Sequence, residues 1–224
     1  MWRGAAGRIV GHCASPASRP AKMRHVSPDL EEFYAHAWLQ LVRGVPDTRH
    51  GFHWPVLATV DGEGAPSARV VVLRAAEPDA GELVFHTDRR APKVEQVRRR
   101  ASVALTFHDG RRKLQVRVRA AAAVHVEGPA YEAGWQRIGS GSRRCYLAPR
   151  PPSTPAAACS ANLPPHLVGK VPTAEEAEAG RARFAVVVCA VTSLDVLELG
   201  RLGHRRARFD LATGRVVAAT WLEP

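Results

Sequence analysis

The sequence predicts a mainly β fold of the α+β class, an antiparallel barrel with short flanking helices. Many short runs alternate with the two-residue period of a strand, and glycine-bearing turns join several of them into hairpins. Six or more such runs with few helices favour a barrel over a doubly wound parallel sheet. The 224 residues are 46% hydrophobic and 24% charged, so we expect one globular domain.

The first expected element is a helix that begins at Pro28. Ser27 supplies an N-cap side chain, Pro28 takes the first helical position, and acidic residues follow. Apolar residues recur at three- and four-residue spacing and form one core-facing stripe, before Gly44 and Pro46 end the helix: Phe33, Ala37, Trp38 and Leu41.

The segment before this helix, residues 1–27, is rich in Arg, Ala, Ser and Gly and contains no acidic residue. We expect a disordered or leader segment over 1–27 and the folded domain over 28–224. An organellar targeting signal and a start at Met23 are the alternatives for this segment.

Strands are expected at residues 56–60, 67–74, 83–87, 102–108, 114–126, 184–191, 195–199, 206–210 and 216–222. Helices are expected at 93–100 and 131–147, with an acidic helical patch near Glu175. Residues 148–167 are rich in Pro, Ala and Ser, so this segment is interpreted as an extended loop.

The net charge of +11 and the pI near 10.5 favour an anionic partner without identifying it. Nucleic acid is not expected, because the basic residues between Arg89 and Arg119 alternate with apolar strand residues and lack stacking aromatics. The four cysteines lack metal-ligand spacing, so we expect no metal and no disulfide, but reduced thiols in a cytoplasmic protein. No apolar run is long enough for a membrane helix, and we expect a soluble protein.

Two segments have the chemistry of an anion site. The run from Arg69 to Arg74 places an arginine at each end of an apolar strand, where a guanidinium can bind phosphate and Val71 and Leu73 can pack a flat ring. The second segment ends a strand and opens a helix, so that Thr87, backbone N–H groups and Lys93 can form a phosphate cradle. Solvated charges on an ordinary strand are the alternative for the first segment. The second lacks the glycine spacing of a P-loop.

Two further segments contain polar groups that suit a ligand. Gln115 is an amide within a strand and can pair with the edge of a flavin or pterin, or with a neighbouring strand. Residues 203–209 concentrate positive charge before a strand, where they can hold an anionic substrate or cofactor, or remain solvated. No hydrolytic triad, carboxylate pair or metalloprotease motif stands out.

Taken in order, these segments resemble the pyridoxamine 5'-phosphate oxidase-like FMN-binding split-barrel family from about Pro28 to Pro224. The resemblance implies a mainly β, antiparallel split β-barrel with flanking short helices. The joint order of several segments carries it: residues 57–61, Pro66 with 69–74, 85–88, Lys93, 114–117, and His204, Arg205 and Arg208.

The family resemblance also implies a homodimer with FMN at its interface, and it assigns roles to particular residues. Arg69 and Lys93 would hold the FMN phosphate, with Thr87 helping, and His86 would also contact the cofactor. Arg74 would lie near both the flavin ring and the substrate, and Arg205 on the substrate side. The remaining cofactor contacts would be the strand that lines the isoalloxazine ring, an amide and a C-terminal arginine: Val70, Val71, Val72, Leu73, Gln115 and Arg208.

The sequence departs from the true oxidase at several of the positions that the family uses. Residues 135–146 do not reproduce its substrate-binding tyrosine, arginine and serine, and Ala207, Gly200 and Pro92 replace a histidine, a tryptophan and a basic residue. The resemblance therefore implies an FMN-binding flavoprotein of the branch without proven vitamin B6 activity, and a flavin-dependent oxidoreductase acting on a small molecule. The alternatives are pyridoxamine or pyridoxine 5'-phosphate oxidase and a non-catalytic binder of flavin or a related tetrapyrrole.

Overall fold

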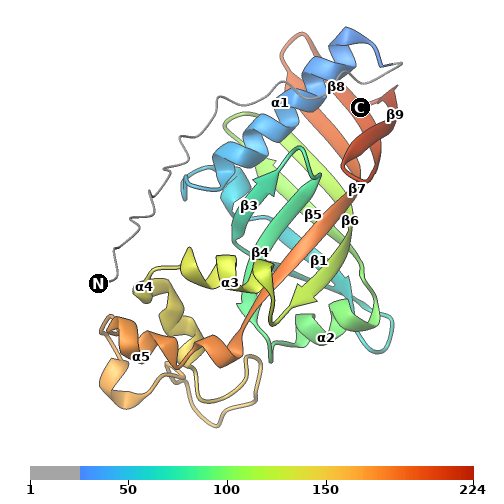
Figure 1. The fold of residues 1–224 in the computed structure, drawn as a ribbon. Helices are drawn as coiled ribbons and strands as arrows, with labels where there is room; N and C mark the ends of the chain where they lie inside the picture. The colour runs from blue at the N-terminus through green and yellow to red at the C-terminus, as the bar shows by residue number, and fades with distance from the viewer. Residues whose placement is uncertain (1–25) are drawn as a thin grey trace, which may run out of the picture.

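The computed structural model of the protein describes residues 26–224, and its centre is one antiparallel sheet (Figure 1). The strands are β1 (Val56–Val60), β2 (Pro66–Val70), β3 (Leu73–Glu77), β4 (Glu82–Asp88), β5 (Ser102–Asp109), β6 (Leu114–His125), β7 (Phe184–Gly200), β8 (Gly203–Ala212) and β9 (Arg215–Leu222). The α-helices are α1 (Pro28–Gly44), α2 (Pro92–Arg99), α3 (Pro129–Gln136), α4 (Ser140–Arg143) and α5 (Ala174–Glu178). The predicted fold class is therefore confirmed. The predicted leader lies, except for its last two residues, outside the described residues.

β7 is the strand on which the two halves of the sheet meet. The strand order is β2–β1–β5–β6–β7–β4–β3, with β8 paired to β7 and β9 to β8. Residues 184–190 of β7 pair with β4, residues 193–200 pair with β8, and β6 follows the other edge of the strand throughout. Thr192 is bulged between the two parts and donates its hydroxyl to the Arg119 carbonyl, 3.1 Å away. This change of neighbour splits the barrel. β7 itself is continuous, whereas the sequence predicted two separate strands, at 184–191 and 195–199.

The prediction of one strand over residues 67–74 is wrong. β2 and β3 lie at opposite ends of the strand order, and Val71 and Val72 cross between them. The Val71 side chain is buried, and its N–H donates to the carbonyl of Pro55, the residue before β1, at 2.9 Å. The apolar pattern continues through the crossing, so the pattern could not show the break.

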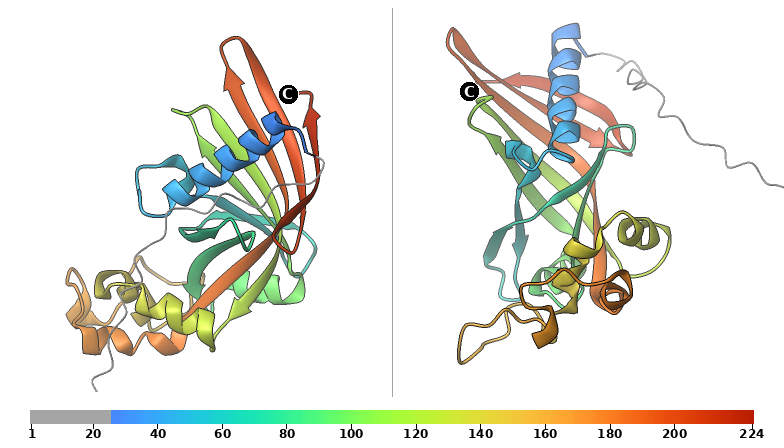
Figure 2. Two further views of the ribbon diagram at one scale, coloured as in Figure 1. Left: turned by 45° about the horizontal axis from the view of Figure 1, so that its top comes forward. Right: turned by 90° about the vertical axis from the view of Figure 1, so that its left-hand side faces the viewer.

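The predicted helix over 131–147 is also wrong, because the chain forms α3, α4 and then a 3-10 turn, Arg144–Leu147. The break falls after Ile138, where Gly139 has an extended backbone (φ −71°, ψ 156°). Glycine is a poor helix former, so a break at this point is physically reasonable. The bend brings α4 beside α5 rather than along the barrel (Figures 1 and 2).

Helix α1 lies across the sheet near β8 and β9 and closes the main core (Figure 2). Its predicted apolar stripe is confirmed, since Phe33, Ala37, Trp38 and Leu41 are all buried. The Phe33 ring stacks on Trp221 of β9, with 5.5 Å between ring centroids. None of the described helices is both long and apolar enough to cross a membrane.

Candidate functional site

A cluster of polar side chains joins β1, β2 and α2 at the end of the barrel away from β8 and β9 (Figure 1). We call it the β2–α2 cluster; its members are Thr59, Ser67, Arg69, Thr87, Lys93 and Gln96. The Arg69 guanidinium donates to the hydroxyls of Thr59 and Ser67, both at 2.5 Å, and to Gln96 Oε1 at 3.0 Å. The cluster therefore holds the guanidinium in one place through neutral oxygens only.

Lys93 supplies the second cation of the β2–α2 cluster. Its Nζ donates to the Thr87 hydroxyl at 3.2 Å, and both residues flank the turn between β4 and α2. Burial lowers the pKa of Lys93, and the nearby positive charge of Arg69 lowers it further, while Asp88 acts in the opposite direction. Burial also lowers the pKa of Arg69. Two partly buried cations thus lie close enough to repel each other.

The two cations of the cluster have no ion-pair partner within residues 26–224, since the nearest carboxylate, Asp88, pairs with Arg90 instead. Such a pair is costly without a compensating anion. The chemistry suits a phosphate group, because a fixed guanidinium and an ammonium group, each bonded to a threonine hydroxyl, lie close enough for their charges to interact. The structure thus brings together Arg69, Thr87 and Lys93, three residues that sequence reasoning proposed for a phosphate.

His86 and Arg74 lie on the other face of the sheet, since they alternate along β4 and β3 with the buried residues Phe85, Thr87 and Leu73. They line a cleft of about 320 Å³ between the β3–β4–β7 sheet and helices α3 and α4. His86 therefore does not join the β2–α2 cluster.

The α3–α4 segment supplies Arg137 and Ser142 to the same cleft, facing Arg74 and His86 from the opposite wall. Apolar side chains form the floor: Val84, Ile138, Val186 and Val188. Neither Arg74 nor Arg137 forms an ion pair with a described carboxylate, although Glu77 and Glu82 also line the cleft. Sequence reasoning missed Arg137 and Ser142, because it treated the segment as one continuous helix.

The His86 imidazole is neutral at physiological pH. Burial lowers its pKa from 6.5 to about 4, and the positive charges of Arg74 and Arg137 add to this effect. Its ring lies edge-on to Phe184, with 5.0 Å between the ring centroids. The cleft therefore contains two cations and a neutral imidazole.

The stability of the fold should depend on pH through His86. Because the folded pKa is depressed, the neutral ring contributes stability above about pH 6.5, and this contribution is lost as the pH falls toward about 4. Between pH 7 and pH 5 the wild-type protein should therefore lose at most about 2 kcal/mol of unfolding free energy through His86. We expect His86→Gln not to show this loss when both proteins are unfolded with urea at the two pH values. His108→Gln, at an exposed position, is the control and should leave the pH dependence unchanged.

The close approach of α3 to the sheet requires Gly134. A Cβ at this position would lie 2.6 Å from Val186 Cγ2 and 3.3 Å from Phe184 Cζ. We expect Gly134→Ala to lower the free energy of unfolding by about 1–3 kcal/mol and to displace α3 from the cleft. Gly139→Ala is the matched control, since nothing lies within 4 Å of its Cβ position. Equal melting temperatures for the two variants would contradict this account.

Gln115, Arg205 and Arg208 do not belong to the β2–α2 cluster, and the two arginines lie far from it within one chain. Gln115 lines a small hollow between β6 and β7. Arg205 pairs with Glu198 at 2.6 Å and covers the Phe33 ring, and Arg208 pairs with Asp210 at 2.8 Å. The β2 and β8 strands are five steps apart in the sheet, which is about 24 Å along its surface.

The run from Val70 to Leu73 presents only part of its side chains to the surface. Val70 is 57% exposed and Val72 is half-buried, whereas Val71 and Leu73 belong to the main core. A flat ring at this position could contact Val70, Val72 and backbone atoms. The side chains of Val71 and Leu73 point into the core, so they cannot contact such a ring.

Comparison with known proteins decides the family. The family model of pyridoxamine 5'-phosphate oxidase matches residues 50–159, which include β1 to β6, the β2–α2 cluster and the cleft residues of α3 and α4. The chain belongs to the pyridoxamine 5'-phosphate oxidase-like split-barrel family. This split-barrel protein is similar to a pyridoxamine 5'-phosphate oxidase-related, FMN-binding protein of Nostoc punctiforme, with a TM-score of 0.66 and 20% identity over 89% of this chain and 99% of that one.

PhzG from Burkholderia lata, solved with tetrahydrophenazine-1-carboxylic acid, shares the fold, with a TM-score of 0.58 and 16% identity over 91% of this chain and 100% of that one. Among curated relatives, the pyridoxine/pyridoxamine 5'-phosphate oxidase of Azorhizobium caulinodans is 31% identical over 130 residues, 58% of this chain and 54% of that protein. The corresponding oxidase of Roseobacter denitrificans is 38% identical over 63 residues, 28% of this chain and 30% of that protein. The split-barrel protein thus matches about half or less of the length of these relatives.

Proposed function

We propose that the protein is a cytoplasmic FMN-binding flavoprotein that acts as a flavin-dependent oxidoreductase on a small molecule. The observation that carries the proposal is the pair of partly buried cations, Arg69 and Lys93, which have no carboxylate partner among residues 26–224. A phosphate monoester supplies the missing negative charge. Membership of a family that includes FMN-binding proteins makes FMN the first candidate.

In this proposal the β2–α2 cluster holds the phosphate through Arg69, Lys93 and Thr87. Val70 and Val72 border the ring, because they are the members of their run with side chains open to the surface. The bound flavin supplies the hydride or electron transfer. The protein contributes fixed positive charge, orientation and a water-poor surface.

We further propose that the protein works as a homodimer. Arg208 lies on β8 and Arg69 on β2, five steps apart in the strand order of the sheet. One FMN is too short to reach both arginines of a single chain. If Gln115 and Arg208 contact FMN, they do so at the site of a second copy. Arg205 would then reach that copy's substrate.

The substrate would bind in the cleft, with an anionic group near Arg74, Arg137 and Ser142. The guanidinium groups of these two arginines form no ion pair among residues 26–224 and favour a carboxylate or phosphate, while the neutral His86 ring adds no charge. The apolar floor suits a flat or aliphatic body.

An absorbance titration with FMN tests the cofactor, followed by anaerobic mixing with reduced nicotinamides. Flavin bands that remain with the protein on gel filtration support the proposal, and bleaching by a nicotinamide identifies a reductase. Absence of any bound flavin would refute it. Bound flavin that no reductant bleaches would indicate a non-catalytic binder.

Oxidation of pyridoxamine or pyridoxine 5'-phosphate is the second candidate, and the match to the family model favours it. It predicts formation of the aldehyde and consumption of oxygen when either compound is added to the FMN-loaded protein. Flavin that is reduced by nicotinamides but not by these compounds would exclude the second candidate and retain the first.

A further inference from the structure

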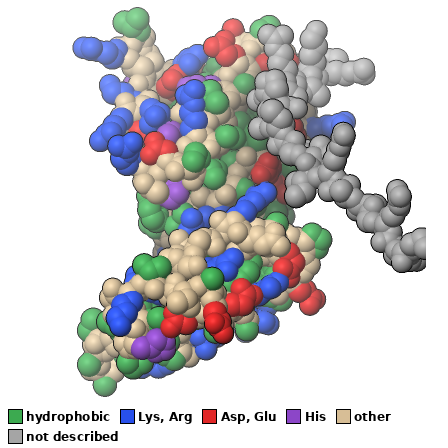
Figure 3. All heavy atoms as spheres, turned by 60° about the vertical axis from the view of Figure 1, so that its left-hand side comes forward, with side chains coloured by type: hydrophobic (Ala, Val, Ile, Leu, Met, Phe, Trp, Pro, Cys, Tyr) green, Lys and Arg blue, Asp and Glu red, His purple; other side chains and the backbone are tan. Residues whose placement is uncertain are grey.

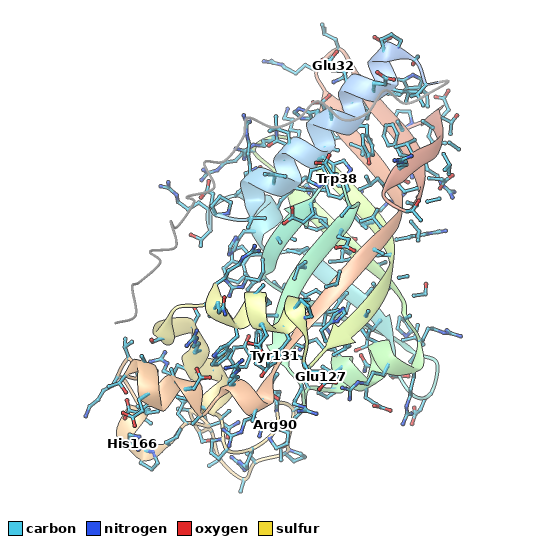
Figure 4. The ribbon with its side chains drawn as sticks, in the orientation of Figure 1. Glu32, Trp38, Arg90, Glu127, Tyr131 and His166 are labelled. Atoms are coloured by element: carbon cyan, nitrogen blue, oxygen red, sulfur yellow. The ribbon has the colours of Figure 1, made fainter. Side chains whose placement is uncertain are left out.

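Arg90 joins two parts of the molecule that are distant in the sequence. Its guanidinium donates to both carboxylate oxygens of Asp88, through Nε at 3.0 Å and Nη2 at 2.6 Å. The same group donates to the backbone carbonyls of Ala148 at 2.8 Å and Pro149 at 3.3 Å. In Figure 4, Arg90 lies where the end of the barrel meets the segment that follows α4. The side chain thus connects the β4–α2 turn to the start of the 148–167 loop.

Asp88 links this connection to the β2–α2 cluster. The carboxylate is buried and pairs with Arg90. Asp88 directly follows Thr87, whose hydroxyl accepts from the Lys93 ammonium at 3.2 Å and donates to the Asp88 carbonyl at 3.4 Å. The Asp88 charge therefore acts on Lys93 without an ion pair, and it opposes the larger effects of burial and Arg69 on the pKa of Lys93. A phosphate bound at Lys93 would neutralise the lysine, so that the Asp88 charge acts on Arg90 alone.

The 148–167 loop is mostly exposed. Its buried side chains are Ala148 at its beginning and Leu167 at its far end. The hydrogen bonds of Arg150 stay inside the loop, since its guanidinium donates to Ser160 and its backbone N–H to Asn162. The Arg90 contacts are the side-chain hydrogen bonds that connect the beginning of the loop to the β4–α2 turn.

We propose that Arg90 is a positioning residue that couples the phosphate site to the 148–167 loop, so that an anion bound at Lys93 orders this loop. This inference rests on the proposed function for the identity of the anion. Coupling between two sites is reciprocal, so an ordered loop also strengthens binding at Lys93 by the same factor. The wall of the cleft formed by α3 and α4 precedes this loop directly, and the coupling thus connects cofactor binding to the substrate side.

Hydrogen exchange of residues 153–163, followed by mass spectrometry with and without FMN, tests the proposal. In the wild-type protein we expect FMN to slow exchange about fivefold. This factor is at the low end of the range for coupled sites, because Arg90 is partly exposed. Arg90→Gln should abolish the slowing and weaken FMN binding about fivefold. Arg150→Gln, which removes an arginine bonded only within the loop, is the matched control and should retain the slowing.

A second variant separates coupling from folding. Arg90→Lys keeps a positive charge opposite Asp88 but cannot make both carbonyl contacts, so it should fold normally and still lose the slowing. The proposal is overturned if bound FMN leaves exchange in the wild-type loop unchanged, or if Arg150→Gln loses as much slowing as Arg90→Gln. If FMN does not bind, the proposed function fails, and inorganic phosphate becomes the probe. Slowing by phosphate would still support the coupling, and no slowing would overturn it.

Discussion

Arg69→Ala is expected to raise the dissociation constant for FMN about tenfold to hundredfold. A hydrogen bond to a charged group contributes about 1.5–3 kcal/mol, and each 1.4 kcal/mol is a factor of about ten in affinity. The guanidinium is held by Thr59, Ser67 and Gln96, so it needs little reorganisation to meet a phosphate. Quenching of flavin fluorescence on titration measures the constant.

Arg98→Ala is the control for Arg69→Ala. Arg98 is an exposed arginine of α2, so its removal changes net charge equally without touching the β2–α2 cluster. We expect its effect on the dissociation constant to be less than about twofold at physiological ionic strength, because exposed charges are screened. Wild-type affinity in Arg69→Ala would remove the central support for a phosphate at this site.

Asp109→Ala is expected to lower the free energy of unfolding by about 1–3 kcal/mol. The carboxylate is 4% exposed and accepts hydrogen bonds from the N–H groups of Gly51, Arg111 and Arg112 and from the Arg112 guanidinium. Its loss removes all of these hydrogen bonds and the connection that they make between the β5–β6 turn and the segment before β1. Urea unfolding of the two proteins at pH 7 gives the difference.

The same carboxylate predicts a dependence on acid. Burial raises the pKa of Asp109, but its hydrogen bonds and the Arg112 charge outweigh burial and lower it from 3.8 to about 2. Its contribution is therefore complete above about pH 4 and is lost as the pH falls toward about 2. Asp210→Ala, which breaks the exposed pair with Arg208, is the control and should cost no more than about 1 kcal/mol. Similar losses in both variants would contradict the account of Asp109.

The sequence predicted the fold well where one periodic signal extends over a whole element. α1, β1 and β4 follow proline, periodicity, alternation and turn signals that local physics determines. The predicted capping is confirmed only in position, since Ser27 is the N-cap residue of α1 but its side chain makes no capping hydrogen bond. The crossing at Val71 and Val72 escaped prediction because a buried connection looks like a buried strand. The continuity of β7 also escaped, since its bulge at Thr192 depends on pairing with β6, which is a tertiary interaction.

The candidate site likewise has residues that the sequence could predict and residues that it could not. Arg69, Thr87 and Lys93 could be proposed from strand ends and a helix start, and the structure places them together. The cleft could not be proposed, because it depends on how α3 and α4 pack beside the sheet, which is a tertiary interaction. The contacts of Gln115 and Arg208 with a flavin stay a prediction.

The pairing of β7 with three other strands affects how the protein unfolds. Among the described strands, β7 is bonded along its first half to β4, along its second half to β8, and along both to β6. Neither half of the sheet can detach without breaking hydrogen bonds of this strand, so no seam allows one half to open alone. We expect the two halves to unfold as a single cooperative unit, with the amides of β7 among the last to exchange.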